Sequence, residues 1–309
     1  MPLDRAFGKL EQQDQVSGVE RKIFEILVHE HKESAISIED FLDLYGADII
    51  ARDQEYVARV KADIEKRPYT KRAQILEALI NEQIELSDWF GPEAQTITPA
   101  DFDDFRNGVD IAVEFEGEEG FKHLALGVDV TSNTAQLADK LGQVKKRILN
   151  GKLTVMKYFK SERSNIRGEL GNIPNLVVGA SGELIQELSE LWLSANNARI
   201  RKDNAGLSQE SIDSQRRLAR EAQKKLAGHR TKVLVLNEMK IQLETFIPFA
   251  AKNGQEGAAA KFSQLLEMVN ELLTDTEISV DDQIKNQQDQ FFLGLAEQLK
   301  AFEGIAVPE

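Results

Sequence analysis

Hydrophobic positions recur with two different periods along the chain, and the period changes near residue 100. In Val19–His31, the apolar residues Ile23, Ile26 and Leu27 follow the three-to-four-residue spacing of a helix. The same spacing predicts three further helices, over Ile38–Leu44, Tyr56–Lys66 and Thr70–Trp89. We therefore expect residues 1–69 to form a helical N-terminal region.

Residues 109–115 and 124–131 alternate between apolar and other side chains, which is the period of a strand. The connector at 116–122 is charged and contains two glycines, so the pair predicts a β-hairpin. If the hairpin turns symmetrically about this connector, paired residue numbers sum to 239, and Asp110 lies opposite Asp129. A helix, two strands and a second helix are predicted next, over 134–149, 153–159, 175–179 and 183–193.

The spacing becomes helical again after residue 196. Asn196–Gly206 is polar and ends in glycine, which is typical of a linker. Four helices are predicted beyond it, over 208–228, 231–250, 257–274 and 280–303. We therefore expect an α/β core at 70–195, with helical regions at 1–69 and 196–309.

Two aspartates on the predicted hairpin carry the candidate chemistry. Opposite residues of a strand pair have Cβ atoms about 5 Å apart, where like charges are destabilising. A divalent cation would explain Asp110 and Asp129, because Mg²⁺ binds one or two carboxylates together with water and phosphate oxygens. The alternative is a strand-end pair that the backbone or a lysine satisfies. The small residues Ala112, Ala125 and Gly127 on the same face would leave room for a ligand.

A lysine and a glutamate are expected to join this site. Lys140 borders the apolar stripe of the predicted 134–149 helix, near the end of the second strand. It could orient water or offset charge during phosphodiester cleavage, or it could extend along the edge of the core. Upstream, Glu77 lies beside an apolar helix face, with Glu82 as the alternative, and each could also be a surface residue.

The order of these features resembles the PD-(D/E)XK superfamily of nucleases. Asp110 in GVDIAVEF would match the motif aspartate, Asp129 in GVDVTSN the acid of the second half-motif, and Glu77 the glutamate that many members carry on the first core helix. The resemblance implies a restriction-endonuclease-like mixed sheet flanked by helices. It also implies Mg²⁺- or Mn²⁺-dependent hydrolysis of phosphodiester bonds, with DNA favoured over RNA. It departs at Thr131, where the motif has lysine. Some members carry that lysine on the following helix, so the resemblance maps it to Lys140.

The formal charge of −14 by itself argues against a nucleic-acid partner. However, residues 139–169 contain nine basic and three acidic residues, and 199–232 contain ten basic and four acidic ones, a net of +6 in each. Such segments could bind a polyanion locally, or they could be ordinary solvated helix faces. In the first segment we expect four residues to bind nucleic acid: Lys145, Lys146, Arg147 and Lys157.

Composition excludes several other classes of function. The chain contains no cysteine, which excludes disulfides, thiolate metal sites and cysteine nucleophiles. It has no G-x-x-x-x-G-K-[ST] motif, so nothing suggests a nucleotide-driven motor. With no apolar stretch of 18 residues and no signal peptide, we expect a cytoplasmic protein without a membrane partner.

Three functions therefore stay open. The leading one is a magnesium-dependent nuclease. The second is a catalytically inactive nuclease-like scaffold or protein-interaction module, which Thr131 and the acidic net charge favour. The third is a helical interaction protein with incidental strands. The flanking helices would recognise substrate, form a homodimer or bind a partner protein.

Overall fold

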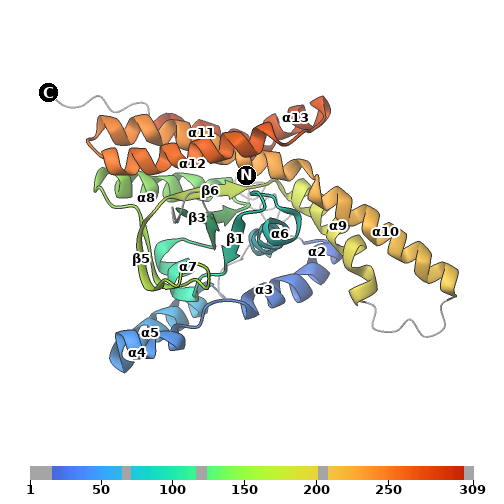
Figure 1. Ribbon diagram of the computed structural model, residues 1–309, viewed down its shortest axis with the longest axis horizontal. Coiled ribbons are helices and arrows are strands. Elements are labelled where there is room, and N and C mark those ends of the chain that lie inside the picture. The colour runs from blue at the N-terminus through green and yellow to red at the C-terminus, as the bar shows by residue number, and fades with distance from the viewer. Residues whose placement is uncertain (1–15, 65–70, 116–123, 201–207, 303–309) are drawn as a thin grey trace, which may run out of the picture.

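The protein is a mixed α/β structure in which helices enclose a four-stranded sheet (Figure 1). The computed structural model describes residues 16–64, 71–115, 124–200 and 208–302. The sheet has the order β1–β2–β3–β6; its first three strands are antiparallel, and β3 and β6 are parallel. The predicted mixed α/β class is confirmed. The strands are β1 (Ala94–Ile97), β2 (Ile111–Phe115), β3 (Leu124–Thr131) and β6 (Asn175–Gly179).

The register of β2 and β3 decides where the two aspartates lie. The paired residue numbers sum to 239 throughout, as predicted. Asp110 precedes β2 and lies just beyond these pairs, and its N–H donates to the Val128 carbonyl at 2.9 Å. Its carboxylate accepts a hydrogen bond from the N–H of Val130 at 2.5 Å. The two aspartates are therefore neighbours at one end of the strand pair, whereas the predicted turn at 116–122 lies outside the described residues.

The two faces of the sheet are covered differently. One face packs against α6 (Lys71–Ser87), and the other packs against a separate ribbon of β4 (Thr154–Lys160) and β5 (Arg167–Ile173). Ala112 and Ala125 are buried beneath this ribbon, in contact with an apolar group that includes Met156, Phe159 and Ile173. The expectation that these small residues leave room for a ligand is therefore wrong, because the ribbon fills that space.

The C-terminal helices close the β6 edge of the sheet. In α11 (Arg230–Lys252), the side chain of Gln242 accepts from the N–H of Val177 at 2.9 Å and donates to its carbonyl at 2.7 Å. Glu238 accepts from the N–H of Gly179 at 2.9 Å. These bonds occupy the backbone groups that a further strand would use, so the edge is blocked against strand addition.

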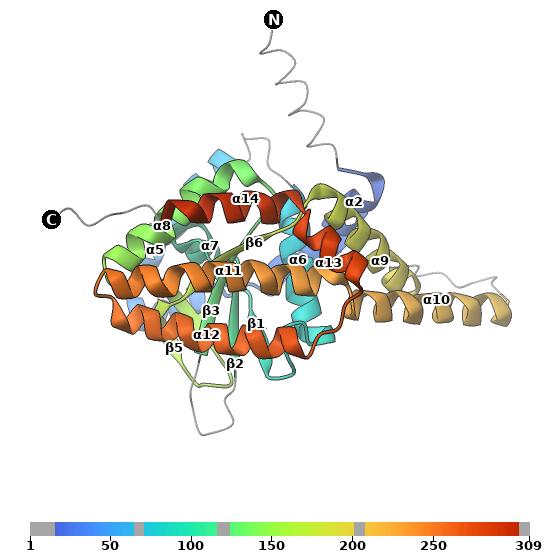
Figure 2. The ribbon, with the colours of Figure 1, turned by 90° about the horizontal axis from the view of Figure 1, so that it is seen from above.

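The remaining C-terminal helices pack on this edge. α11 and α12 lie side by side above β6 and α8, and α14 runs along α8 (Figures 1 and 2). The helix predicted over 280–303 is divided, since Asp289 caps a new helix through the N–H groups of Phe291 and Phe292. The bounds are α8 (Leu137–Leu149), α12 (Glu256–Thr274), α13 (Val280–Gln287) and α14 (Gln290–Leu299).

The other helices lie on the far side of the sheet or extend from it. α4 and α5 lie opposite α11 and α12, and α9 and α10 form a pair that extends away from the sheet (Figure 1). Helix α9 continues to Ile200, so the first part of the predicted linker is helical. The bounds are α2 (Gly18–Ile23), a π-helical turn (Phe24–Val28), α3 (His29–Glu33), α4 (Leu42–Tyr45), α5 (Ala47–Ile64), α7 (Asp101–Asn107), α9 (Gly182–Ile200) and α10 (Gln209–Ala227).

One continuous core joins the predicted regions. Its largest apolar cluster includes Ile23 from the N-terminal helices, Leu79 and Val128 from the α/β part, and Phe246 from α11. The division at residues 69 and 195 stays a prediction about units that fold separately. Within the described ranges, no helix is long and apolar enough to cross a bilayer.

We expect Gln242→Ala to destabilise the protein strongly. The substitution leaves the N–H and carbonyl of Val177 without partners in a buried environment, and each such group costs about 1–3 kcal/mol. The free energy of unfolding in urea should therefore fall by about 2–5 kcal/mol. Gln264→Ala, at an exposed position of α12, is the control and should change it by less than about 0.5 kcal/mol. Equal losses in both variants would contradict the role of Gln242.

Candidate functional site

Asp110 and Asp129 form the centre of the candidate site. Asp129 lies near the end of β3 and is largely buried. Asp110 reaches it because Gly108 ends α7 in the left-handed conformation, with φ +64°, and turns the chain into β2. A side chain at position 108 would be strained in that conformation, and its Cβ would lie 3.4 Å from Asp129 Oδ2. The Gly-Val-Asp sequence thus sets the geometry of the site.

Asp104 is a third carboxyl group that the sequence analysis missed. It lies on α7 and is hydrogen bonded to Asp110. Its pKa is raised well above the ordinary value by burial, and further by the negative charge of Asp110. The available signal was its place in DFDDFRNG, one helical turn before the left-handed Gly108. Without the short helix α7, which was not predicted, nothing distinguished Asp104 from the neighbouring Asp101 and Asp103.

Glu77 is the fourth carboxyl group, and it reaches the site from α6. It lies near enough to Asp104 and Asp110 for its charge to raise the pKa of both. Its Oε1 is hydrogen bonded to Nε2 of the buried His31 at 2.9 Å. The alternative residue, Glu82, instead accepts a hydrogen bond from the indole of Trp192 at 2.5 Å. The structure therefore brings Glu77 to the carboxylates and directs Glu82 towards α9.

Lys140 and Arg147 supply the positive charge. Lys140, with a side chain 22% exposed, forms an ion pair with Asp129. Arg147 lies two turns further along α8, on the same face of the helix. Its guanidinium donates to Thr154 Oγ1 at 2.7 Å and to the Asn107 carbonyl at 2.9 Å. The predicted place of Lys140 beside the aspartates is confirmed, and Arg147 lies near enough to influence Asp129 electrostatically.

The carboxyl groups repel one another strongly. Burial raises the pKa of Asp110, and the charge of Glu77 raises it further. Burial likewise raises the pKa of Asp129, and the charge of Asp110 adds to the effect. Burial opposes the charged form of Lys140, yet the charges of Asp129 and Asp110 outweigh this and raise its pKa. The site is therefore short of positive charge.

The composition of the cluster fits a divalent cation. Four carboxylates and two basic side chains leave a formal charge of −2 when all of them are ionised. In the described part of the chain, no three Asp, Glu or His side chains are grouped as ready-made metal ligands. Magnesium does not require such a group, because it binds through one or two carboxylates and completes its shell with water and phosphate oxygens. Asp110 and Asp129 are the pair that could hold it.

No protein-family model, curated protein or solved structure matches the chain. Function must therefore be inferred from the site itself, because a fold class hosts many activities.

The four residues expected to bind nucleic acid lie in different surroundings. Lys146 is exposed, and Arg147 is held beside Asp129. Lys145 donates to the Ala301 carbonyl at 2.6 Å, and its ammonium group lies over aromatic rings of the C-terminal region. Lys157 forms an ion pair with Asp53, and its ammonium group lies 5.1–5.2 Å from three ring centroids. Of these four side chains, Lys146 is the exposed one, and the other three are held by contacts within the protein.

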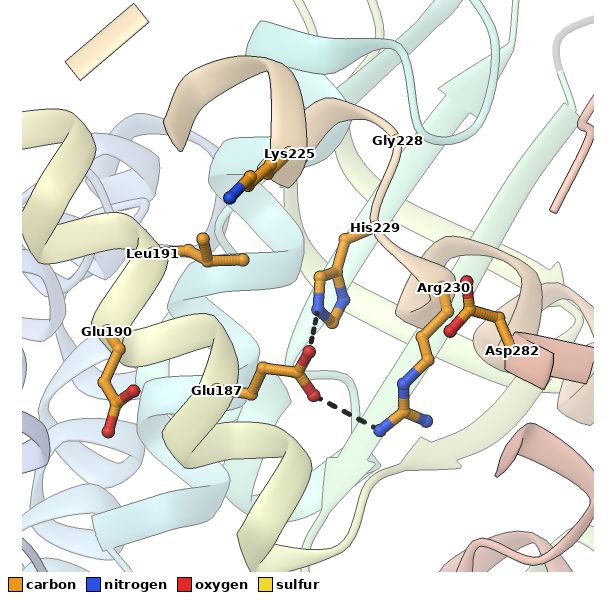
Figure 3. Close-up of a pocket in the computed structure, with 8 residues that line it drawn as sticks. All are labelled: Glu187, Glu190, Leu191, Lys225, Gly228, His229, Arg230 and Asp282. Carbon is orange, nitrogen blue, oxygen red and sulfur yellow. Dashed lines mark hydrogen bonds and ion pairs between the residues drawn. The ribbon is translucent and has the colours of Figure 1, made fainter. Parts of the chain in front are cut away.

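A cleft of about 470 Å³ lies away from the carboxylates, where α9, α11 and α13 meet (Figure 3). Three of the side chains that line it, Glu187, His229 and Arg230, face one another (Figure 3). Glu187 lies 3.3 Å from His229 Nε2 and 3.3 Å from the Arg230 guanidinium, which also donates to Asn286. These contacts join the three helices, so we interpret the cleft as a structural junction and place the candidate site at the carboxylates.

We expect Asp110→Asn to stabilise the metal-free protein at alkaline pH. Since the pKa of Asp110 is raised by folding, its ionisation destabilises the native state as pH rises above the ordinary carboxyl range. In EDTA at pH 8, the variant should gain about 1 kcal/mol in free energy of unfolding, a value reduced for partial exposure. The gain should vanish near pH 4.

The matched control is Glu267→Gln, which removes an exposed carboxylate from α12. It should leave the pH dependence of unfolding unchanged. If Asp110→Asn is no more stable than the unsubstituted protein at pH 8, the carboxylates do not repel one another as described.

Proposed function

We propose that the protein is a divalent-metal-dependent nuclease that hydrolyses phosphodiester bonds, with DNA favoured over RNA. The observation that carries this proposal is the β2–β3 register, which brings Asp110 and Asp129 together and leaves Lys140 paired with Asp129. Two adjacent, partly buried carboxylates with a lysine at their edge are a suitable arrangement for phosphodiester cleavage assisted by a metal ion.

The order of elements supports the proposed PD-(D/E)XK relationship. Along the chain, helix α6 carries Glu77, β2 begins after Asp110, β3 ends just beyond Asp129 and α8 carries Lys140. A parallel strand, β6, follows and pairs with β3. This is the order expected from the sequence resemblance, including the lysine that has moved from position 131 to the following helix.

Each side chain then has a distinct role. Asp110 and Asp129 would hold Mg²⁺ or Mn²⁺, which when bound would polarise the phosphate and lower the pKa of a coordinated water. Lys140 would leave its ion pair with Asp129 to orient the attacking water or to offset charge on the phosphate. Arg147 would bind a phosphate oxygen through its planar guanidinium, and Lys146 would contact the backbone nearby.

A catalytically inactive scaffold or protein-interaction module is the second candidate. Two observations favour it: Thr131 stands where the motif has lysine, and Lys140 satisfies Asp129 without a metal. An exposed apolar pair on α13, Val280 and Ile284, is available for a protein partner or a second copy of the chain. A protein of this kind would bind its partner regardless of divalent cations.

We expect the purified protein to cleave nucleic acid only in the presence of Mg²⁺ or Mn²⁺. Linear and circular double-stranded DNA, single-stranded DNA and RNA would be incubated with each metal or with EDTA. Asp129→Asn should reduce the cleavage rate by at least about a hundredfold, because it removes a charged ligand, while Glu267→Gln should cleave normally. If no substrate is cleaved and no cation raises the melting temperature, the scaffold function is the correct one.

Lys140 should affect turnover more than substrate binding. We expect Lys140→Gln to lower kcat by about 10²–10³-fold, as is typical when a group that stabilises transition-state charge is removed. Its KM should change by no more than about threefold. Lys146→Gln, on the same helix but exposed, should do the opposite and raise KM with little effect on kcat. Identical kinetics of the two variants would exclude a catalytic role for Lys140.

A further inference from the structure

His31 is a buried histidine beside the candidate site, and its two ring nitrogens have different surroundings. Its side chain is 3% exposed, and Nε2 lies 2.9 Å from Glu77 Oε1. Nδ1 is buried and has no hydrogen-bond partner among the described residues. Burying a polar atom without a partner is unfavourable, so this arrangement calls for a compensating role.

The partners of the ring define its tautomer. A carboxylate is only an acceptor, so Nε2 carries the proton that it donates to Glu77. His31 thus donates to one oxygen of Glu77 and fixes the orientation of that oxygen.

The backbone places His31 in a specific way. The helix from Gly18 to Glu33 is interrupted by a π-helical turn at Phe24–Val28, immediately before α3. A π-helical turn adds a residue to the helical repeat, so it rotates every following side chain around the helix axis. His29, two residues earlier on α3, is 71% exposed and lies 3.3 Å from Glu33. The N-terminal helices therefore direct only one of the two histidines at Glu77.

We propose that His31 is a positioning residue that holds Glu77 in the orientation in which it serves the metal site. This inference rests on the proposed function. Glu77 is the one carboxylate of the cluster supplied by α6, and its position must be fixed against repulsion from Asp104 and Asp110. A hydrogen bond from a buried imidazole supplies that restraint.

The test compares three variants of the full chain. His31→Leu removes the donor but keeps the position apolar and filled, whereas His31→Gln restores an N–H donor. His29→Leu is the matched control on the same helix. Two quantities would be measured: the affinity for Mn²⁺, from the free Mn²⁺ signal in electron paramagnetic resonance, and kcat for cleavage of DNA. Circular dichroism would establish that each variant is folded.

We expect His31→Leu to lower both the Mn²⁺ affinity and kcat by about 10- to 100-fold, the usual effect of losing such a supporting hydrogen bond. His31→Gln should recover most of the loss, and His29→Leu should resemble the unsubstituted protein. In a Glu77→Gln background, His31→Leu should cause little further loss, because the two residues act as one unit.

Two results would overturn the inference. If His31→Leu keeps the Mn²⁺ affinity and kcat within about twofold of the unsubstituted protein, or loses as much in the Glu77→Gln background, His31 does not act through Glu77. In that case the proposed nuclease function still stands. If the unsubstituted protein neither binds Mn²⁺ nor cleaves any nucleic acid, the proposed function fails and this inference fails with it.

Discussion

The pairing of β2 with β3 is the constraint on which the rest of the site depends. A register in which residue numbers sum to 239 places Asp110 beside Asp129, and it is fixed because a shift by one residue would exchange the core and outer faces of both strands. The fold therefore forces two carboxylates together at the place where like charges are least tolerated. Helix α7 brings Asp104, whose hydrogen bond to Asp110 lowers the pKa of Asp110 and so relieves part of that repulsion.

The surrounding elements keep these carboxyl groups close together and offset part of their negative charge. Lys140 and Arg147 extend from one face of α8, and α14 packs against the same helix. Glu77 is held from α6 by His31, so the N-terminal helices also contact the site. Gln242 and Glu238 block the β6 edge and tie α11 to the sheet. Helices from both ends of the chain thus support one small group of charges, which explains why they share a core with the sheet.

Sequence patterns predicted the parts of this arrangement that have strong periodicity. The alternation in β2 and β3 was sufficient for their register, and the stripe of α8 was sufficient for the place of Lys140. Three elements were not predicted from the sequence because their patterns are short or weak. β1 has four residues, α7 has seven, and β5 contains glycine and few apolar side chains. Asp104 was missed with α7, and the role of His31 was missed because its partner Glu77 lies 46 residues further along the chain. The small residues of β2 and β3 led to the wrong expectation of space for a ligand, because sequence alone does not show that β4 and β5 cover them.

The central claim is that Asp110 and Asp129 together hold a divalent cation. The most direct measurement is anomalous diffraction from crystals of the protein grown with millimolar Mn²⁺ at pH 7.5. We predict one anomalous peak in contact with both carboxylates, with Lys140 displaced from Asp129. No peak at this position, with Lys140 still paired to Asp129, would contradict the claim and identify the cluster as a structural network of charges.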